Sequence, residues 1–169
     1  LIVGRDIIRR WRDEGSSGEP PLIISEVKAS QVLYDGIEEA GGRALMWKTG
    51  HSLIKAKMKE TKAAAAGEMS GHMFFADRYF GFDDGLYGAM RILEVYLGAL
   101  HTGSCQHFSE LLGDIPDTVA TPEIRFECEE DSKFLLVDKF TMDSPAPLQA
   151  GPDGNYPVPM PGLIGKREY

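Results

Sequence analysis

Short apolar runs that alternate with amphipathic segments constrain the fold of this chain more than any other feature. The runs at 22–24, 43–47 and 63–67 have the length and composition of strands in a sheet that is buried on both faces. Around them, apolar residues recur at helical spacing, as in helices with one buried face. The positions that predict these helices are Val3, Ile7, Ile8 and Trp11; Val32, Leu33, Ile37 and Ala40; Leu53, Ile54 and Met58; and Leu86, Met90, Leu93 and Leu97. Strands that alternate with helices predict an α/β layer structure with a largely parallel sheet.

The pattern changes after about residue 113. Residues 114–122 predict a connector, and 123–128 alternate like a strand with one solvent-exposed face. Apolar residues between 134 and 140 predict one more short helix. From 144 onward the chain contains six of its ten prolines together with several glycines, which predicts an extended or mobile tail.

The charge balance argues against two classes of partner. The chain has 18 Lys and Arg against 26 Asp and Glu, a net charge of −8. Nucleic acids and anionic lipids both favour clustered Lys and Arg, so we expect neither as a partner. One basic group, formed by Lys55, Lys57, Lys59 and Lys62, is interleaved with apolar residues and is interpreted as a solvated helix face. No apolar run approaches the roughly 20 residues of a membrane span.

The cysteines and the first residues bear on where the protein works. Cys105 and Cys128 have neither metal-ligand spacing nor the pattern of a disulfide framework, so a reduced, cytoplasmic protein is expected. The sequence carries no secretory signal. It begins at Leu1, without an initiator Met, in a segment typical of the middle of a helix. We therefore expect a piece of a longer protein.

Polar residues follow three predicted strands at the point where each strand ends. Lys28, His51 and Glu68 each lie in a strand-to-helix or strand-to-loop connection. In parallel sheets these connections meet at one edge, where ligands bind. Lys28 follows a hydrophobic strand, where partial desolvation would suit it to phosphate binding or proton transfer. His51 lies in the first turn of a helix, where free N–H groups favour an anion.

The segment 68–72 is the densest polar cluster outside the charged helix faces. Gly67 and Gly71 bracket it and allow the backbone to turn tightly and approach a ligand. Glu68 and Ser70, two residues apart in an extended loop, would project to the same side. A carboxylate and a hydroxyl in that arrangement can accept and donate hydrogen bonds to vicinal sugar hydroxyls.

Each of these residues also has an explanation without a ligand. Lys28 can reach solvent from a strand end, His51 can be an ordinary residue of a helix start, and 68–72 can be a polar loop. His51, Glu68 and His72 contain the residue types of a two-histidine, one-carboxylate metal site, but their spacing matches no known motif.

Two further motifs are better explained by structure. Asp83, before Gly85, is interpreted as a helix N-cap, with Asp84 favoured by the helix dipole. Residues 48–50 lack the glycine-rich lead of a P-loop.

Several motifs together resemble the bacterial phosphomannomutase/phosphoglucomutase enzymes of the α-D-phosphohexomutase family. The segments 67–72, 74–75 and 81–85 resemble the sugar-binding loop of that family and the helix after it. The segments 27–28 and 47–52 match in the expected order and distance, and the resemblance covers about residues 1–140. Phosphoglucosamine mutases usually have Gln where this chain has Met69, which favours the mannose/glucose enzymes.

The resemblance implies a fold and a domain organisation. Family members have four domains around a central cleft. By resemblance, 1–112 is the third, sugar-binding domain, 113–143 is a connector and the start of the fourth domain, and 144–169 is a tail outside the family pattern. We expect a three-layer sandwich in which a mostly parallel mixed sheet is flanked by helices.

The resemblance also implies a reaction and roles for the site residues. Family members interconvert hexose 1-phosphate and hexose 6-phosphate through a hexose 1,6-bisphosphate, with a phosphoserine and Mg²⁺. Glu68 and Ser70 would hold the sugar O3 and O4 hydroxyls, His51 and Lys28 would contact the ligand near its reacting end, and His72 or Lys28 would assist proton transfer. The predicted catalytic residues are thus Lys28 and His72, and the predicted substrate-binding residues are His51, Glu68 and Ser70.

The family's phosphoserine loop, metal loop and last phosphate-binding loop are absent from this sequence. We therefore expect no metal ligand here, Mg²⁺ bound by residues outside this chain, and an isolated chain that is inactive. The partners implied are a hexose phosphate and the remaining domains of the parent enzyme. A non-catalytic module that binds a phosphosugar or a protein surface is the alternative. Mannose and glucose phosphates share the O3 and O4 arrangement, so the sequence does not choose between them.

Overall fold

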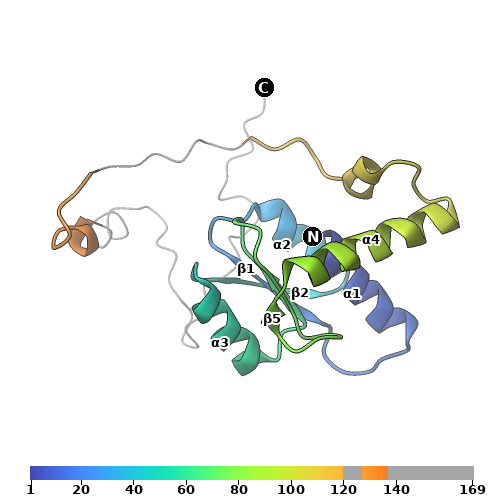
Figure 1. Cartoon of the computed structure of the whole chain (residues 1–169), viewed down its shortest axis with the longest axis horizontal. Helices are drawn as coiled ribbons and strands as arrows, with labels where there is room; N and C mark the ends of the chain where they lie inside the picture. Colours follow the sequence, from blue (N-terminus) through green and yellow to red (C-terminus); the bar gives the residue numbers. More distant parts are fainter. Residues whose placement is uncertain (120–126, 137–169) are drawn as a thin grey trace.

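The computed structural model of the 169-residue chain describes residues 1–119 and 127–136. The elements, in chain order, are α1 (Ile2–Asp13), β1 (Leu22–Glu26), α2 (Gln31–Glu39), β2 (Arg43–Trp47), α3 (His51–Thr61), β3 (Ala65–Gly67), β4 (Met73–Phe75), β5 (Phe82–Asp83), α4 (Gly85–Thr102) and the 3-10 helix η1 (Phe108–Leu112). Helices and strands alternate from α1 to β3, as the sequence predicts (Figure 1).

The strands form one mixed sheet in the order β2-β1-β3-β4-β5. β1 is parallel to β2 and β3, whereas β4 is antiparallel to β3 and β5. Four of the five strands therefore point the same way, which confirms the mostly parallel mixed sheet. The strand predicted at 63–67 begins only at Ala65, because the Ala63 amide still bonds to Met58 at the end of α3.

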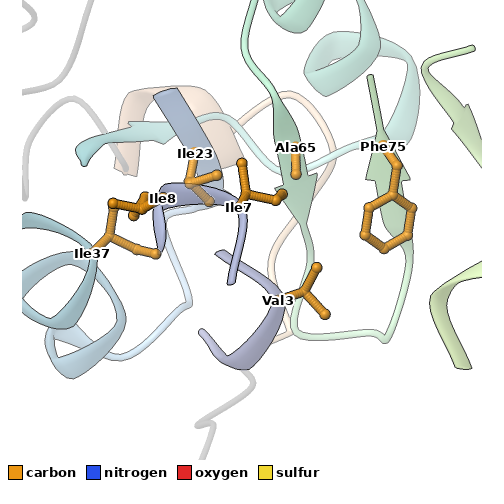
Figure 2. Packing of buried hydrophobic residues seen from close by; sticks show 7 residues of the cluster. All are labelled: Val3, Ile7, Ile8, Ile23, Ile37, Ala65 and Phe75. Carbon is orange, nitrogen blue, oxygen red and sulfur yellow. The ribbon is translucent and has the colours of Figure 1, made fainter. Parts of the chain in front are cut away.

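Hydrophobic cores on both faces of the sheet give the fold three layers. On one face, α1 and α2 pack against the strands, through Val3, Ile7, Ile8, Ile23, Ile37, Ala65 and Phe75 (Figure 2). On the other face α3 packs, and that core contains Ile24, Leu45, Ile54, Met58, Ala63, Ala66 and Phe74. Adjacent strand residues enter opposite cores because side chains alternate across a sheet. This arrangement confirms the three-layer α/β sandwich.

The apolar stripe predicted for the long helix α4 faces solvent. Its members Leu86, Met90, Leu93 and Leu97 are all exposed, by 44% to 78%. α4 instead buries Gly88 and Arg91. A Cβ at Gly88 would lie 2.4 Å from the Met73 Cε atom, so glycine allows α4 to approach β4 closely. Arg91 pairs with Asp77 at 2.8 Å.

The predicted solvated face of basic residues is wrong for one of its members. Lys57 is only 3% exposed, and its Nζ atom lies 4.3 Å from the centre of the Trp47 ring and 2.8 Å from a Glu60 carboxylate oxygen. The remaining lysines of the group, Lys55, Lys59 and Lys62, are exposed as predicted. Lys57 is buried because an aromatic face and a carboxylate together replace its water.

Little of the predicted carboxyl-terminal organisation falls on described residues. Residues 133–136 are helical, but most of the strand predicted at 123–128 and the tail from 144 lie outside the described ranges. In the predicted connector, Asp114 pairs with Arg5 of α1 at 2.9 Å, and the domain boundary after 112 stays a prediction. Within the described ranges no helix combines the length and apolar character needed to cross a bilayer. Cys105 and Cys128 are both unbridged.

Candidate functional site

The predicted site residues gather at the carboxyl-end edge of the parallel strands. Glu26 at the end of β1 pairs in register with Trp47 at the end of β2, and Ser25 pairs with Gly67 at the end of β3. Three connections therefore leave the sheet at one level. Lys28 lies two residues beyond β1, His51 is the first residue of α3 beyond β2, and Glu68 follows β3 directly.

A hydrogen bond joins the second and third connections. Oε1 of Glu68 accepts from the backbone N–H of Gly50 at 2.8 Å. Gly50 has φ +129°, a conformation that favours glycine, and it precedes the first residue of α3. The Glu68 carboxylate is thus fixed beside the amino-terminal end of that helix. The ring centres of His51 and His72 lie 6.4 Å apart, which brings the two histidines to the same place.

The segment 68–72 forms a closed turn between β3 and β4, whereas the sequence predicts an extended loop. The N–H of Glu68 donates to the carbonyl of His72 at 2.9 Å, and the N–H of Gly71 donates to the carbonyl of Glu68 at 3.0 Å. Gly71 has φ +94°, which favours glycine in such a turn. Met69 and Ser70 at the tip are exposed.

His72 pairs with Asp83, which overturns the assignment of Asp83 as a helix cap. Nδ1 of His72 lies 2.5 Å from Oδ2 of Asp83 in β5. The N-cap of α4 is Asp84, whose carboxylate accepts from the Tyr87 N–H at 2.9 Å. That backbone hydrogen bond lowers the pKa of Asp84, helped by the Tyr79 hydroxyl. The cap lies one residue later than predicted because β5 continues through Asp83.

Lys28 lies at the surface beside the end of β1. Its side chain is 52% accessible, so part of it is covered and the rest faces solvent. The Nζ atom lies 3.9 Å from Oε2 of Glu26, whose side chain is only 1% accessible. The strand therefore buries Glu26 and leaves Lys28 at the surface beside it.

Sequence reasoning missed two carboxylates of this edge, Glu26 and Asp83. Glu26 accepts the Met69 N–H through Oε1 at 2.7 Å, which ties the first connection to the 68–72 turn. The sequence shows Glu26 only as a charged residue at the end of a mostly apolar strand. The contact of Asp83 with His72 spans 11 residues and depends on the pairing of β4 with β5.

Three cavities lined by described residues, with volumes of about 520, 580 and 260 Å³, lie away from this edge. The first lies between α1 and α4, and the second lies along α4. A concave rim therefore stays a prediction. Within residues 1–119 and 127–136, no three His, Cys, Asp or Glu side chains are placed to hold a metal ion.

The chain is similar to known proteins of one family. Residues 3–119 match a family model described as "Phosphoglucomutase/phosphomannomutase, alpha/beta/alpha domain III". The phosphomannomutase/phosphoglucomutase of Pseudomonas aeruginosa is 49% identical over 145 residues, which is 85% of this chain and 28% of that protein. The phosphoglucomutase of Neisseria gonorrhoeae is 46% identical over 132 residues, 78% of this chain and 26% of its own length.

A solved structure resembles the fold as well. It is a phosphoglucomutase/phosphomannomutase family protein from Burkholderia thailandensis, with a TM-score of 0.55 and 44% identity over 70% of this chain and 25% of that one. A phosphomannomutase-like structure from Thermus thermophilus, at 18% identity and a TM-score of 0.51, supports the fold alone. This chain spans about a quarter of the length of the curated relatives.

Proposed function

This chain belongs to the phosphoglucomutase/phosphomannomutase family, and on that premise we propose that it is the sugar-recognition part of an enzyme that interconverts hexose 1-phosphate and hexose 6-phosphate. The observation that carries the proposal is the hydrogen bond of Glu68 to Gly50, which fixes a carboxylate where three strand connections meet. A carboxylate held by a backbone N–H keeps its orientation without a ligand, so a sugar need not order it on binding.

Glu68 and Ser70 are the proposed contacts for the sugar O3 and O4 hydroxyls. Glu68 uses Oε1 for Gly50, and Oε2 remains for a hydroxyl, since no other hydrogen bond to it occurs within the described part of the chain. Ser70 is exposed at the tip of the turn and can donate or accept. A hydrogen bond to a charged carboxylate is the stronger of the two contacts.

Lys28, His51 and His72 are the proposed contacts at the reacting end. His51 begins α3, whose free N–H groups favour a phosphate, and Lys28 supplies a positive charge from the neighbouring connection. His72 is held through Nδ1 by Asp83, so Nε2 is the nitrogen that would face the ligand and move a proton.

The phosphoserine and Mg²⁺ of the reaction are proposed to come from outside this chain. The donor set of the described residues does not fit a metal ion, and no step is assigned to one here. Mg²⁺, when bound to the complete enzyme, would neutralise the charge of the phosphoryl group in transfer. A binding module without chemistry is the second candidate, since the chain is about a quarter of the length of its relatives.

Titration of the ¹⁵N-labelled chain with glucose 1-phosphate, followed by NMR, tests the sugar-recognition proposal. We expect the amide resonances of Glu68, Ser70 and His51 to shift, and to shift less with inorganic phosphate or with glucose alone. Glu68→Gln should weaken the shifts, whereas the control Glu39→Gln, at an exposed position at the end of α2, should leave them unchanged. Shifts confined to other surfaces, or equal for inorganic phosphate and the sugar phosphate, contradict the proposal.

A further inference from the structure

Glu26 is a buried carboxylate that the proposed chemistry does not use. It ends β1 and is 1% exposed. Its main-chain carbonyl accepts hydrogen bonds from the Tyr34 hydroxyl at 2.7 Å and from the Ala29 N–H at 3.0 Å. Burial raises the pKa of Tyr34 to about 12, so this hydroxyl stays a donor at neutral pH. These two hydrogen bonds hold the main-chain carbonyl of Glu26 at the end of β1.

The two oxygens of the Glu26 carboxylate have different surroundings. Oε1 accepts the Met69 N–H at 2.7 Å, across 43 residues of sequence. Oε2 is buried and has no hydrogen-bond partner within the described residues, and the Lys28 Nζ atom lies 3.9 Å from it. A buried carboxylate is unfavourable without a compensating charge, so Oε2 attracts the Lys28 ammonium. One side chain thus acts on two connections of the candidate site.

A second hydrogen bond links β1 to β3 at this edge without involving the Glu26 carboxylate. Ser25, one residue earlier, already links β1 to β3 through its hydroxyl, which donates to the Gly67 carbonyl at 2.9 Å. Met69, in contrast, is 67% exposed and adds nothing to either core. The bond from Glu26 therefore joins the end of β1 to the tip of the 68–72 turn rather than to the sheet.

We infer that Glu26 is a positioning residue that sets the separation of the Lys28 ammonium from the 68–72 turn. The inference rests on the proposed function, in which Lys28 contacts the phosphate end of a hexose phosphate and Glu68 and Ser70 contact its hydroxyls. Glu26 touches no ligand in this proposal, because only 1% of the residue is exposed. It keeps two parts of one binding surface at the spacing that a single sugar phosphate requires.

Three variants of this chain separate positioning from stability. Glu26→Met removes the acceptor and the charge at similar length, and Glu26→Gln keeps an acceptor for Met69 but removes the charge. The control Tyr34→Phe removes a buried hydrogen bond to the Glu26 main chain and leaves the carboxylate contacts in place. For each, we would measure unfolding in urea, amide exchange of Met69, and affinity for glucose 1-phosphate by NMR.

We expect Glu26→Met to speed Met69 exchange and to weaken glucose 1-phosphate binding, each by about tenfold, as for one lost hydrogen bond to a charged group. Tyr34→Phe should lower stability while exchange at Met69 and affinity stay within about twofold, which is less than a typical lost contact. Unchanged Met69 exchange in a folded Glu26→Met variant overturns the inference. So does a Tyr34→Phe variant that loses as much affinity as Glu26→Met.

A double-mutant cycle settles the inference if Glu26→Met does not fold. Glu26→Gln should weaken glucose 1-phosphate binding about threefold in the wild-type chain and have no further effect in a Lys28→Met background, since the two residues are coupled. Equal effects in both backgrounds overturn the link to Lys28. If the wild-type chain binds no sugar phosphate, the proposed function fails. Met69 exchange in Glu26→Met, compared with Glu26→Gln, which keeps the acceptor, still decides whether Glu26 positions the turn.

Discussion

At the scale of single residues, the candidate site is built from polar groups that are already oriented by their neighbours. Glu68 is held by the Gly50 N–H and His72 by the Asp83 carboxylate. Oriented groups lose little conformational entropy when a ligand binds, so mutations that keep size but remove charge should be informative. Each of these two pairs leads to one prediction.

The first concerns Glu68 in a full-length family enzyme that carries this domain. Gln retains an oxygen for Gly50 but removes the negative charge. Glu68→Gln should therefore lower kcat/KM by a factor that corresponds to a loss of about 1.5–3 kcal/mol of transition-state stabilisation. His72→Ala should act mainly on kcat if His72 moves a proton. Steady-state kinetics of both variants tests this. Hydrolytic loss of the enzyme's phosphate involves no sugar and should change little. An unaltered kcat/KM in Glu68→Gln would remove the turn from the mechanism.

The second concerns the partner of His72. Asp83→Asn keeps the shape of the side chain but removes the charge that orients the imidazole, so kcat of the same full-length enzyme should fall about tenfold with little change in KM. Asp117→Asn, at an exposed position outside the site, is the matched control. A rise in KM without a fall in kcat would show that Asp83 contributes to substrate binding and does not act through His72.

The sequence predicts which polar residues meet at the edge of the sheet, but not the partners that hold them. Lys28, His51 and Glu68 were predictable because parallel strands end at one edge, whatever the detailed packing. Glu26 and Asp83 were not, because their contacts with Met69 and His72 depend on the shape of a turn and on strand pairing. The roles of all these residues in catalysis and binding stay predictions.

At the scale of elements, periodicity found the long helices and the buried strands, and it failed for short ones. β4 and β5 have three and two residues, too few to show alternation, so periodicity predicts neither strand. Without β5, the sequence favours Asp83 as the helix cap. Tertiary pairing of β4 with β3 makes these strands, and no local pattern reports it.

The position of that cap gives the third prediction. Asp84→Ala should lower the free energy of unfolding by about 1 kcal/mol, because the Tyr87 N–H loses its acceptor at the start of α4. Urea unfolding followed by circular dichroism measures the change. Asp83→Ala is the matched control and should cost less, since its carboxylate contacts a half-exposed His72. A larger loss in Asp83→Ala would restore the cap to Asp83.

An ionic cluster between α1 and α4 gives a prediction about pH. A hydrogen bond from Arg78, with the charges of Arg10 and Arg78, lowers the pKa of Glu94 from 4.5 to about 2. Because the folded pKa lies below the unfolded one, the stabilisation is complete above about pH 4.5 and is lost as pH falls towards 2. Glu94 is 40% accessible, so solvent screening holds its contribution to about 1 kcal/mol or less.

The measurement is the free energy of unfolding of wild type and Glu94→Gln in urea between about pH 6 and 2.5, the range set by this linkage. We expect wild type to be more stable at the upper end and the two curves to converge at the lower end. Glu39→Gln, at an exposed position at the end of α2, serves as the control and should follow wild type throughout. A constant difference across the range would show that Glu94 contributes through packing rather than charge.

At the scale of the whole molecule, the surface of α4 is the feature that the sequence described only in part. Helical spacing identified the stripe of Leu86, Met90, Leu93 and Leu97, but spacing does not say which face of a helix its own domain covers. Gly88 and Arg91 mark the covered face instead. Apolar patches of this kind mark interaction surfaces in many proteins, and the relatives are about four times as long as the part of them that this chain matches.

The same difference in length leads to the last prediction, that this chain alone shows no mutase turnover. Phosphoryl transfer requires a nucleophile and positioned positive charge around the phosphate, and the family model that residues 3–119 match is that of the third domain. Contacts to the sugar alone stabilise the bound substrate and the transition state equally, so they do not lower the barrier to phosphoryl transfer from the bound state. We therefore expect the purified chain, with Mg²⁺ and hexose 1,6-bisphosphate, to convert neither glucose 1-phosphate nor mannose 1-phosphate above the rate of a Glu68→Ala/His72→Ala double variant. That variant retains the fold's cores, since neither residue belongs to them, and so reports any contaminating enzyme. Turnover that the double variant lacks would place the whole catalytic apparatus within these 169 residues and would overturn the assignment of the chain as a recognition domain.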